Sequence, residues 1–263
     1  MVRLRDKIMV FNILKNNYFR LKGVRLRDKI ILLQCYIIAG INYFFNSKKF
    51  VTVGQFLRKD ILVKDENGII FYARGMREDL GYIAGNTKPE TSKWFMPKNG
   101  EIVIDAGAAI GKFSLLAAKN GAYVISIEPH PLTYNALMKN IELNGFKNIR
   151  ALNIAVGKEE GKAELYSPKK YFGTASLKNY WENRFDKEKY VVNIVPLDSI
   201  TSNIKRIDWL LIDVEGFEYE VLLGAEETLK KTRNIIIEIS RENIDKVREL
   251  IFSYHFNLVE VGE

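Results

Sequence analysis

The sequence predicts an α/β fold with a mostly parallel sheet, and three observations support this prediction. From Glu101 onward, strand-like and helix-like runs of residues alternate. A glycine-containing turn follows the first strand-like run, and acidic residues end several of the later ones. Alternation of this kind gives parallel strands with helices on both faces of the sheet, and such folds bind ligands at the carboxyl ends of the strands. We therefore expect the functional residues at those ends.

Two kinds of run define the expected elements. Short apolar runs predict strands at 102–105, 123–127, 151–153, 191–195, 209–212 and 235–238. Longer amphipathic runs predict helices at 112–120, 132–144, 219–231 and 242–253.

The segment before residue 99 has a different character. Asn67-Gly68 between two apolar runs predicts a β-hairpin. The sequence thus predicts three parts: a basic helical extension (1–48), a small β-hairpin lead-in packed on the core (49–98) and a ligand-binding domain (99–263).

Charge is distributed unevenly along the 263 residues. The formal net charge is +8, yet the first 50 residues alone hold eleven Lys and Arg against two acids. The remaining 213 residues are close to neutral, with 29 basic and 30 acidic side chains. The chain is therefore a basic arm on a neutral body.

The basic arm predicts two helices. Apolar residues recur at helical spacing from Leu4 to Leu21, which indicates a basic amphipathic helix that ends near Gly23. A second helix is expected from about Arg25, and its run Ile30–Ser47 contains no charge. A run of this length reaches the lower limit of a membrane span, although several polar residues dilute it. A span, an interfacial or partner-buried helix, and a helix packed on the body remain open.

Composition excludes several classes of protein. A single cysteine, Cys35, excludes an internal disulfide, and two histidines, His130 and His255, make a His-rich metal centre improbable. No apolar stretch with a cleavage site follows the basic start, so we expect a cytoplasmic protein, with association to a membrane surface through the arm as a further expectation.

The first candidate site is the turn after the first predicted strand. Asp105, Gly107 and Gly111 form Asp-x-Gly-x-x-x-Gly, which differs from the dinucleotide-binding fingerprint. The glycines permit a tight turn and a close backbone approach, and the acid suits a cationic ligand such as an ammonium or a sulfonium. A plain glycine-rich turn is the alternative.

Two further polar residues end the next two predicted strands. Glu128 stands 23 residues after Asp105, where an acid accepts hydrogen bonds from ribose hydroxyls. Its alternative role is to face the dipole of the following helix. Asn153 ends the third strand and would read an adenine edge or simply form a turn.

Acidic residues gather at the later strand ends. Asp213 and Glu215 stand two residues apart, and Glu238 ends the next strand. Crowded carboxylates favour a cation, water or a proton to accept, and one raises the pKa of the other. Helix capping is the alternative. The three acids do not form a recognisable ligand spacing, so we predict no obligatory metal.

These motifs resemble, in order, those of the FkbM-type methyltransferases. The resemblance covers about residues 60–260, and its most specific part is Asp213-Val-Glu-Gly-Phe-Glu218. It implies a class I, Rossmann-like sheet of seven strands, whose last strand (about 256–261) runs antiparallel. It also implies methyl transfer from S-adenosylmethionine, usually to a hydroxyl oxygen.

The resemblance also assigns roles to individual residues. It implies that the methionine side of the cofactor is lined by Asp105, Gly107, Ala108 and Gly111. Glu128 would hold the ribose and Asn153 would lie near adenine, while Asp213 and Glu215 would face the acceptor and accept its proton. Ala109 departs from the family, which often has Asn there, and this removes one polar contact near the cofactor.

The sequence thus predicts an O-methyltransferase for a sugar, glycolipid or related small metabolite. Glu238 and Ser176, the latter in the possible acceptor loop 171–183, are weaker candidates for substrate binding. Methylation of RNA or an amino group, with the arm as anchor, is an alternative, although acids at the strand ends disfavour nucleic acid. A scaffold that has lost the chemistry is another. The arm (1–47) is expected to contact an anionic membrane surface or a protein partner.

Overall fold

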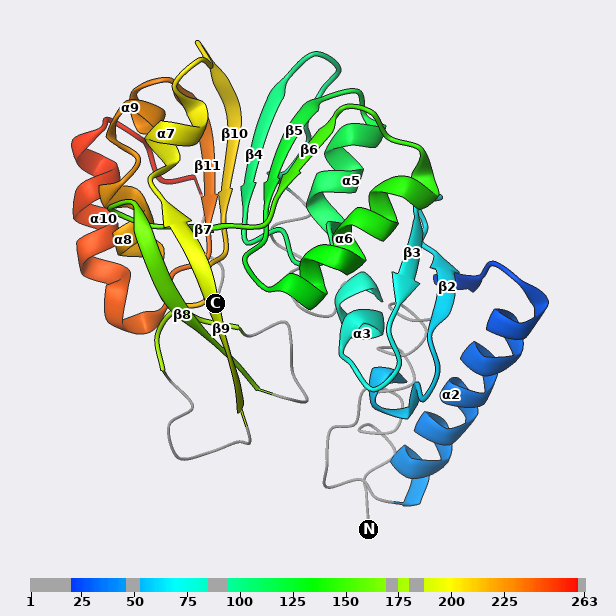
Figure 1. Cartoon of the computed structure of the whole chain (residues 1–263). Coiled ribbons are helices and arrows are strands. Elements are labelled where there is room, and N and C mark those ends of the chain that lie inside the picture. Colours follow the sequence, from blue (N-terminus) through cyan, green and yellow to red (C-terminus); the bar gives the residue numbers. More distant parts are fainter. Residues whose placement is uncertain (1–19, 46–52, 85–93, 169–174, 180–186, 260–263) are drawn as a thin grey trace. The chain divides into compact units, whose positions relative to one another are not determined.

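The computed structural model describes residues 20–45, 53–84, 94–168, 175–179 and 187–259, with the side chains of 43–45 left aside (Figure 1). The chain divides into two compact units, residues 1–89 with 142–144, and residues 90–141 with 145–263. The helix predicted over residues 4–21 lies almost wholly outside the described residues. The division into three parts stays a prediction.

The first unit contains a small antiparallel sheet and a long helix. Its elements are β1 (Lys22–Gly23), α2 (Leu26–Phe45), η2 (Val53–Phe56), β2 (Ile61–Lys64), β3 (Ile70–Ala73) and α3 (Asp79–Ala84). The strand order is β1-β2-β3. The predicted hairpin is confirmed, since β2 pairs antiparallel with β3, and Gly68 takes a positive φ of 77° in the turn. Gly23 pairs in β1 with Val63, so the structure has a strand where the sequence predicted a helix end.

Helix α2 begins at Leu26, close to the predicted start, and one side of it packs against the rest of the first unit. Leu32, Cys35 and Ala39 are buried there. Asp28 is also buried, and its carboxylate accepts a hydrogen bond of 2.7 Å from Arg25 Nε. Among the helices of the described ranges, none has the length and apolar character needed to cross a membrane.

The second unit contains the α/β part of the chain. Its first half comprises β4 (Ile102–Ala106), α5 (Lys112–Lys119), β5 (Tyr123–Ile127), α6 (Pro131–Asn144), β6 (Ile149–Leu152), β7 (Ala155–Val156) and β8 (Gly161–Pro168). Its second half comprises β9 (Lys187–Val195), α7 (Leu197–Thr201), β10 (Ile207–Ile212), α8 (Glu218–Leu223), α9 (Glu226–Lys230), β11 (Thr232–Ile237), η4 (Arg241–Asn243) and α10 (Ile244–Ser253).

The central sheet is parallel and has helices on both faces, as Figure 1 shows. The strand order is β11-β10-β4-β5-β6, and every neighbouring pair is parallel. Successive residues of β4 face opposite sides: Val103 packs with the α5 residues Ala117 and Ala118, whereas Ile104 packs with Val221 and other residues of α8 and α9. The predicted α/β Rossmann-like fold is therefore present.

The number of strands in the central sheet differs from the prediction. The sequence predicted seven, and the described residues give five. Residues 191–195 belong to β9, which pairs antiparallel with β8 over eight residue pairs in a separate sheet of order β7-β9-β8. The described part of the predicted last strand, 256–259, forms no strand. Phe256 packs against the core, but Leu258, which would follow it on the same face of a strand, is mostly exposed. Burial therefore does not continue along one face as a strand would need.

A predicted helix also breaks in two. The sequence predicted one helix over 219–231, but α8 ends at Leu223 and α9 begins at Glu226. Gly224 lies at the break, where an added Cβ would stand 2.0 Å from the carbonyl oxygen of Gly157. The close approach of this loop to Gly157 requires glycine and interrupts the helix.

Candidate active site

The register of the central sheet brings five predicted site residues into one row. Leu152, Ile127, Ala106, Ile212 and Ile237 are aligned across the five strands. The next residues along the chain are therefore neighbours at the carboxyl edge of the sheet, in the order Asn153, Glu128, Gly107, Asp213 and Glu238. β4 lies at the centre of this row, where the strand order reverses and parallel sheets bind their ligands.

The turn after β4 lies directly against the turn after β10. The backbone N–H of Asp213 donates to the carbonyl of Ala106 at 2.9 Å. A Cβ added at Gly107 would stand 1.8 Å from the carbonyl oxygen of Asp213, and Gly107 also has a positive φ of 89°. Only glycine fits this position, which confirms the expected close backbone approach.

Gly111 is the last residue of the same turn and directly precedes α5. It has a φ of 94°, and an added Cβ would stand 2.5 Å from Leu137 Cδ1. Between the two glycines, Ala108 is buried and its N–H donates to Ile127. The glycine spacing therefore serves the packing of the β4 turn against α5 and α6, and its role toward a cofactor stays a prediction.

Glu128 is a buried carboxylate that braces two turns. Its Oε2 accepts from the backbone N–H of Ala109 at 2.9 Å, and its Oε1 accepts from the N–H of His130 at 2.8 Å. Ala109 has a φ of 49°, in the left-handed region where Asn is better tolerated than Ala. The family's frequent Asn thus also has a conformational basis here.

Asp105, near the end of β4, is held by a buried chain of two hydroxyl groups from α5 and β5. Ser126 Oγ donates to Ser114 Oγ at 2.6 Å, and Ser114 Oγ donates to Asp105 Oδ2 at 2.5 Å. Burial raises the pKa of Asp105 to about 6, and the negative charge of Asp213 adds to this rise, while the hydrogen bond from Ser114 opposes it. A cationic ligand near this edge would favour the ionised form.

Asn153 and His130 both have local structural contacts. Asn153 Nδ2 donates to the carbonyl oxygens of Glu128 and Pro129, at 2.8 and 3.0 Å. The amide therefore orders the Glu128 turn, and its proximity to adenine stays a prediction. His130 is buried just before α6, where its Nδ1 accepts from the N–H of Thr133 at 3.4 Å, consistent with a residue at the start of a helix.

The turn after β10 holds the two predicted catalytic acids, and both are partly buried. Glu215 has a φ of 49°, which is unusual for a residue with a side chain. Its carbonyl accepts from Ser176 Oγ at 2.6 Å. The buried Ser176 thus touches the turn through its backbone, and Glu238 is exposed at the end of the row.

Glu218 fixes the other side of this turn. Its Oε1 accepts from the N–H of Gly216 at 2.6 Å, and its Oε2 accepts from Ser240 Oγ and Asn243 Nδ2, both at 2.9 Å. Asn243 Nδ2 also donates to the carbonyl of Gly216 at 3.0 Å. The backbone after Asp213 is therefore tied to the segment that follows β11.

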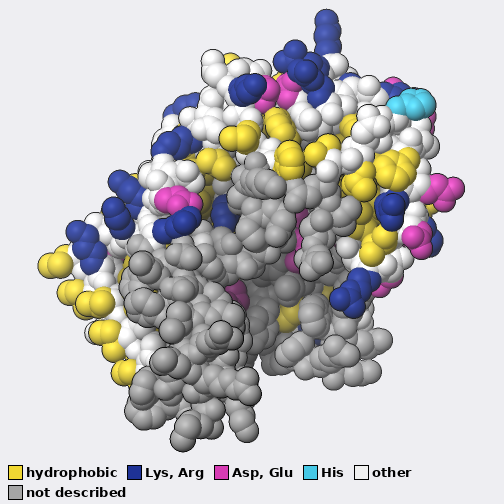
Figure 2. Space-filling view, turned by 180° about the vertical axis from the view of Figure 1, so that it is seen from behind, with side chains coloured by type: hydrophobic (Ala, Val, Ile, Leu, Met, Phe, Trp, Pro, Cys, Tyr) yellow, Lys and Arg dark blue, Asp and Glu magenta, His cyan; other side chains and the backbone are white. Residues whose placement is uncertain are grey.

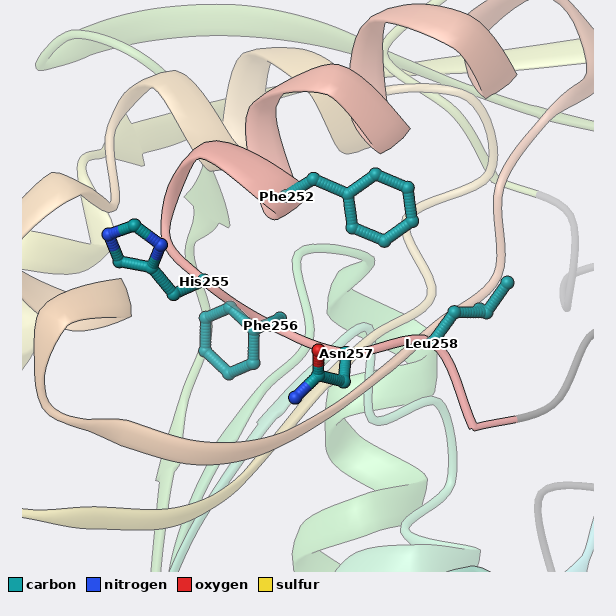
Figure 3. Close-up of a pocket in the computed structure, with 5 residues that line it drawn as sticks. All are labelled: Phe252, His255, Phe256, Asn257 and Leu258. Carbon is teal, nitrogen blue, oxygen red and sulfur yellow. The ribbon is translucent and has the colours of Figure 1, made fainter.

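A separate pocket of 460 Å³ lies beyond α10, as Figure 3 shows. It is lined by Phe252, His255, Phe256, Asn257 and Leu258. None of these is a predicted site residue. Over the described ranges, no group of three or more His, Cys, Asp and Glu is arranged to hold a metal ion.

A comparison with known protein families identifies the family of this chain. Residues 105–258, more than half of the chain, match the Methyltransferase FkbM domain. The chain belongs to this family. The matched range begins at Asp105 and contains every predicted site residue.

Individual relatives of this FkbM chain are distant. "Methyltransferase 1" of Beauveria bassiana is 25% identical over 160 residues, which cover 52% of this chain and 64% of the relative. The chain thus spans less than two thirds of that protein. "2-O-methyltransferase NoeI" of Sinorhizobium fredii is 23% identical over 210 residues, 73% of this chain and 84% of the relative. A solved precorrin-6y C5,15-methyltransferase from Geobacter metallireducens matches with a TM-score of 0.40 at 9% identity, over 64% of this chain and 70% of that one.

The structure adds residues that the sequence did not single out. Ser114 and Ser126 are polar residues in otherwise apolar runs. A polar residue in such a run indicates a buried hydrogen bond, and this pattern could have identified them. Glu218 stands inside the FkbM motif, but its spacing alone did not reveal a partner 25 residues away in Asn243.

Proposed function

We propose that this chain is an S-adenosylmethionine-dependent O-methyltransferase, acting on a hydroxyl of a sugar, glycolipid or related small metabolite. The observation that carries the proposal is the contact between the Gly107 turn and the backbone of Asp213. It joins the place expected for the cofactor to the place expected for a base. A relative named as a 2-O-methyltransferase supports an oxygen acceptor.

The residues at the sheet edge fit S-adenosylmethionine. Asp105 is the carboxylate proposed to favour the sulfonium cation, and the absence of a side chain at Gly107 lets its turn pack directly against the Asp213 carbonyl. Glu128 accepts backbone N–H groups on both carboxylate oxygens, and a carboxylate oxygen can accept more than one hydrogen bond, so we propose that it also accepts from the ribose hydroxyls. When bound, the cofactor supplies a methyl group that its sulfonium has already activated.

The protein's own contribution is to hold the acceptor and remove its proton. A protonated hydroxyl is a poor nucleophile, so a carboxylate that accepts the proton as the bond forms raises the rate. Asp213 is the first candidate, since it directly follows a rigid central strand. Glu215 is the second, on a turn that Ser176 and Glu218 hold. Positioning and exclusion of water complete the catalysis.

Binding of the cofactor is tested by calorimetry with S-adenosylmethionine. The wild type should bind, and Glu128→Gln should lose roughly 10- to 100-fold in affinity, because it weakens charge-assisted hydrogen bonds. Glu249→Gln on the exposed surface of α10 serves as the control and should bind normally. Absence of binding by the wild type would overturn the cofactor assignment.

The acceptor is tested with deuterated-methyl S-adenosylmethionine. Sugars, extracted glycolipids and total RNA are offered separately, and mass spectrometry locates the label. We expect label on a hydroxyl of a sugar or glycolipid, and Asp213→Asn should lower the rate by about 10²–10⁴ while it retains cofactor binding. Label on RNA or on nitrogen would contradict the proposal, and cofactor binding without any product would indicate a scaffold.

A further inference from the structure

Helix α2 has two apolar sides, and only one of them is covered by described residues. Asp28, Leu32, Cys35 and Ala39 are buried on the first side. At 3.6 residues per turn, the opposite side carries a stripe of five aliphatic residues. These are Leu26, Ile30, Leu33, Ile37 and Ile41, which are 49–74% exposed.

This stripe is visible at the molecular surface. Figure 2 shows a column of hydrophobic side chains at its left edge, with Lys and Arg side chains above it. A contiguous exposed aliphatic surface of this kind marks an interaction site, whereas single exposed apolar residues do not.

The cations stand at one end of the stripe. Lys22, Arg25, Arg27 and Lys29 are all exposed around the start of α2. The one acid of the helix, Asp28, is buried and paired with Arg25. The exposed surface of α2 therefore combines aliphatic residues with positive charge and presents no acid.

We propose that the exposed side of α2 lies in the plane of an anionic membrane surface. The aliphatic stripe would enter the boundary between headgroups and acyl chains, and the cations would contact anionic headgroups. A second copy of the chain is the competing occupant. Because the exposed side of α2 has no acid, two such helices would gain no charge pairing. An anionic lipid surface complements Lys22, Arg27 and Lys29, the cations that Asp28 does not neutralise.

The proposal is tested by sedimentation of the full chain with vesicles. Vesicles of phosphatidylcholine with 30% phosphatidylserine are compared with phosphatidylcholine alone. We expect binding to the anionic vesicles that weakens with added salt. Leu33→Gln with Ile37→Gln should remove most of this binding, because Gln keeps the helix but removes two apolar contacts.

A matched control carries the same change elsewhere. Met138→Gln with Leu223→Gln replaces exposed apolar residues on helices of the other unit and should bind like the wild type. For the charges, Lys22→Gln with Lys29→Gln should weaken binding by roughly fivefold per residue. Lys147→Gln with Lys205→Gln is the corresponding control.

Several outcomes would overturn the proposal. Wild type that ignores anionic vesicles, or a Leu33/Ile37 variant that binds as well as wild type, would show that α2 does not contact the membrane. Sedimentation velocity without lipid then measures the oligomeric state of the wild type and of this variant. A dimer that dissociates on substitution would assign the stripe to a second copy instead.

Discussion

The carboxylates at the ends of β4 and β5 and those in the turn after β10 stand at the same edge of one sheet, yet their surroundings differ. Asp105 and Glu128 are buried and accept hydrogen bonds from Ser114 and from two backbone N–H groups. Asp213 and Glu215 are only partly buried, and their turn is fixed through its backbone. We call these the buried half and the open half of the site.

The difference suits two kinds of ligand. A cofactor of constant structure is best bound by groups that are already fixed, since little entropy is then lost on binding. In the proposed function the open half faces the acceptor, and partly buried side chains on a fixed backbone can still adjust to bind it. The following predictions test this contrast, from the largest expected effect to the smallest.

Gly107→Ala should have the largest effect, because Gly107 lies on the border between the halves. Its Cβ would collide with the carbonyl of Asp213, and we expect a loss of about 2–4 kcal/mol in the free energy of unfolding, together with loss of cofactor binding. Gly100→Ala is the control, since it has a φ of 79° with open space around it. It should cost only about 1 kcal/mol. Equal losses in urea unfolding would show that backbone strain, not the contact between the halves, is responsible.

Asp105→Asn tests the buried half through pH. Burial raises the pKa of Asp105 to about 6, whereas an unfolded Asp titrates near 3.9. Between these values the folded protein keeps a proton that the unfolded chain has lost, so the stability of the wild type falls as pH rises from about 4 to about 6. Above pH 6 the Asn variant should be more stable by roughly 2–3 kcal/mol.

Urea unfolding at pH 4 and pH 7.5 measures this difference. The advantage of the Asn variant should be small at pH 4 and fully developed at pH 7.5. Affinity for the sulfonium cofactor should nevertheless decrease in the variant, because a negative charge is lost. A pH-independent difference would show that Asp105 ionises normally.

Glu218→Gln tests the open half. The substituted amide would place a donor against the N–H of Gly216 or against Ser240 and Asn243, at a cost of about 2 kcal/mol. Because the turn of Glu215 would loosen, the catalytic rate should fall while the affinity for the cofactor stays unchanged. Steady-state kinetics with calorimetry separates the two, with Glu249→Gln as control. Loss of cofactor affinity would mean that the halves are not distinct.

The sequence was most informative for features that depend only on neighbouring residues along the chain. Alternating apolar runs predicted the parallel sheet. Polar residues at strand ends, three acids and Asn153, predicted four of the five residues in the row, because strand ends meet at one edge. The glycine motif predicted the fifth, Gly107. Local rules failed for β9, whose partner β8 is set by pairing across the chain, and for the helix broken at Gly224, whose cause is the distant carbonyl of Gly157. The same limit concealed the contacts of Glu218 and Ser114.

Ala109→Asn should have the smallest effect, and it tests whether the backbone of the buried half is strained at residue 109. Asn adopts a φ of 49° more readily than Ala, so stability should rise by about 0.5–1 kcal/mol while the N–H bond to Glu128 is kept. Ala109→Val should act in the opposite direction, since β-branched residues avoid this region. Thermal unfolding measures both. Two variants of equal stability would exclude backbone strain at this turn.

The contact at Gly107 has a thermodynamic consequence. Because no atom fits between this turn and the carbonyl of Asp213, a shift of either backbone displaces the other. Occupancy of one half should then change the affinity of the other, and linkage requires the two changes to be equal in size. Titrating the acceptor with and without S-adenosylhomocysteine, and the reverse, would measure this cooperativity from both directions.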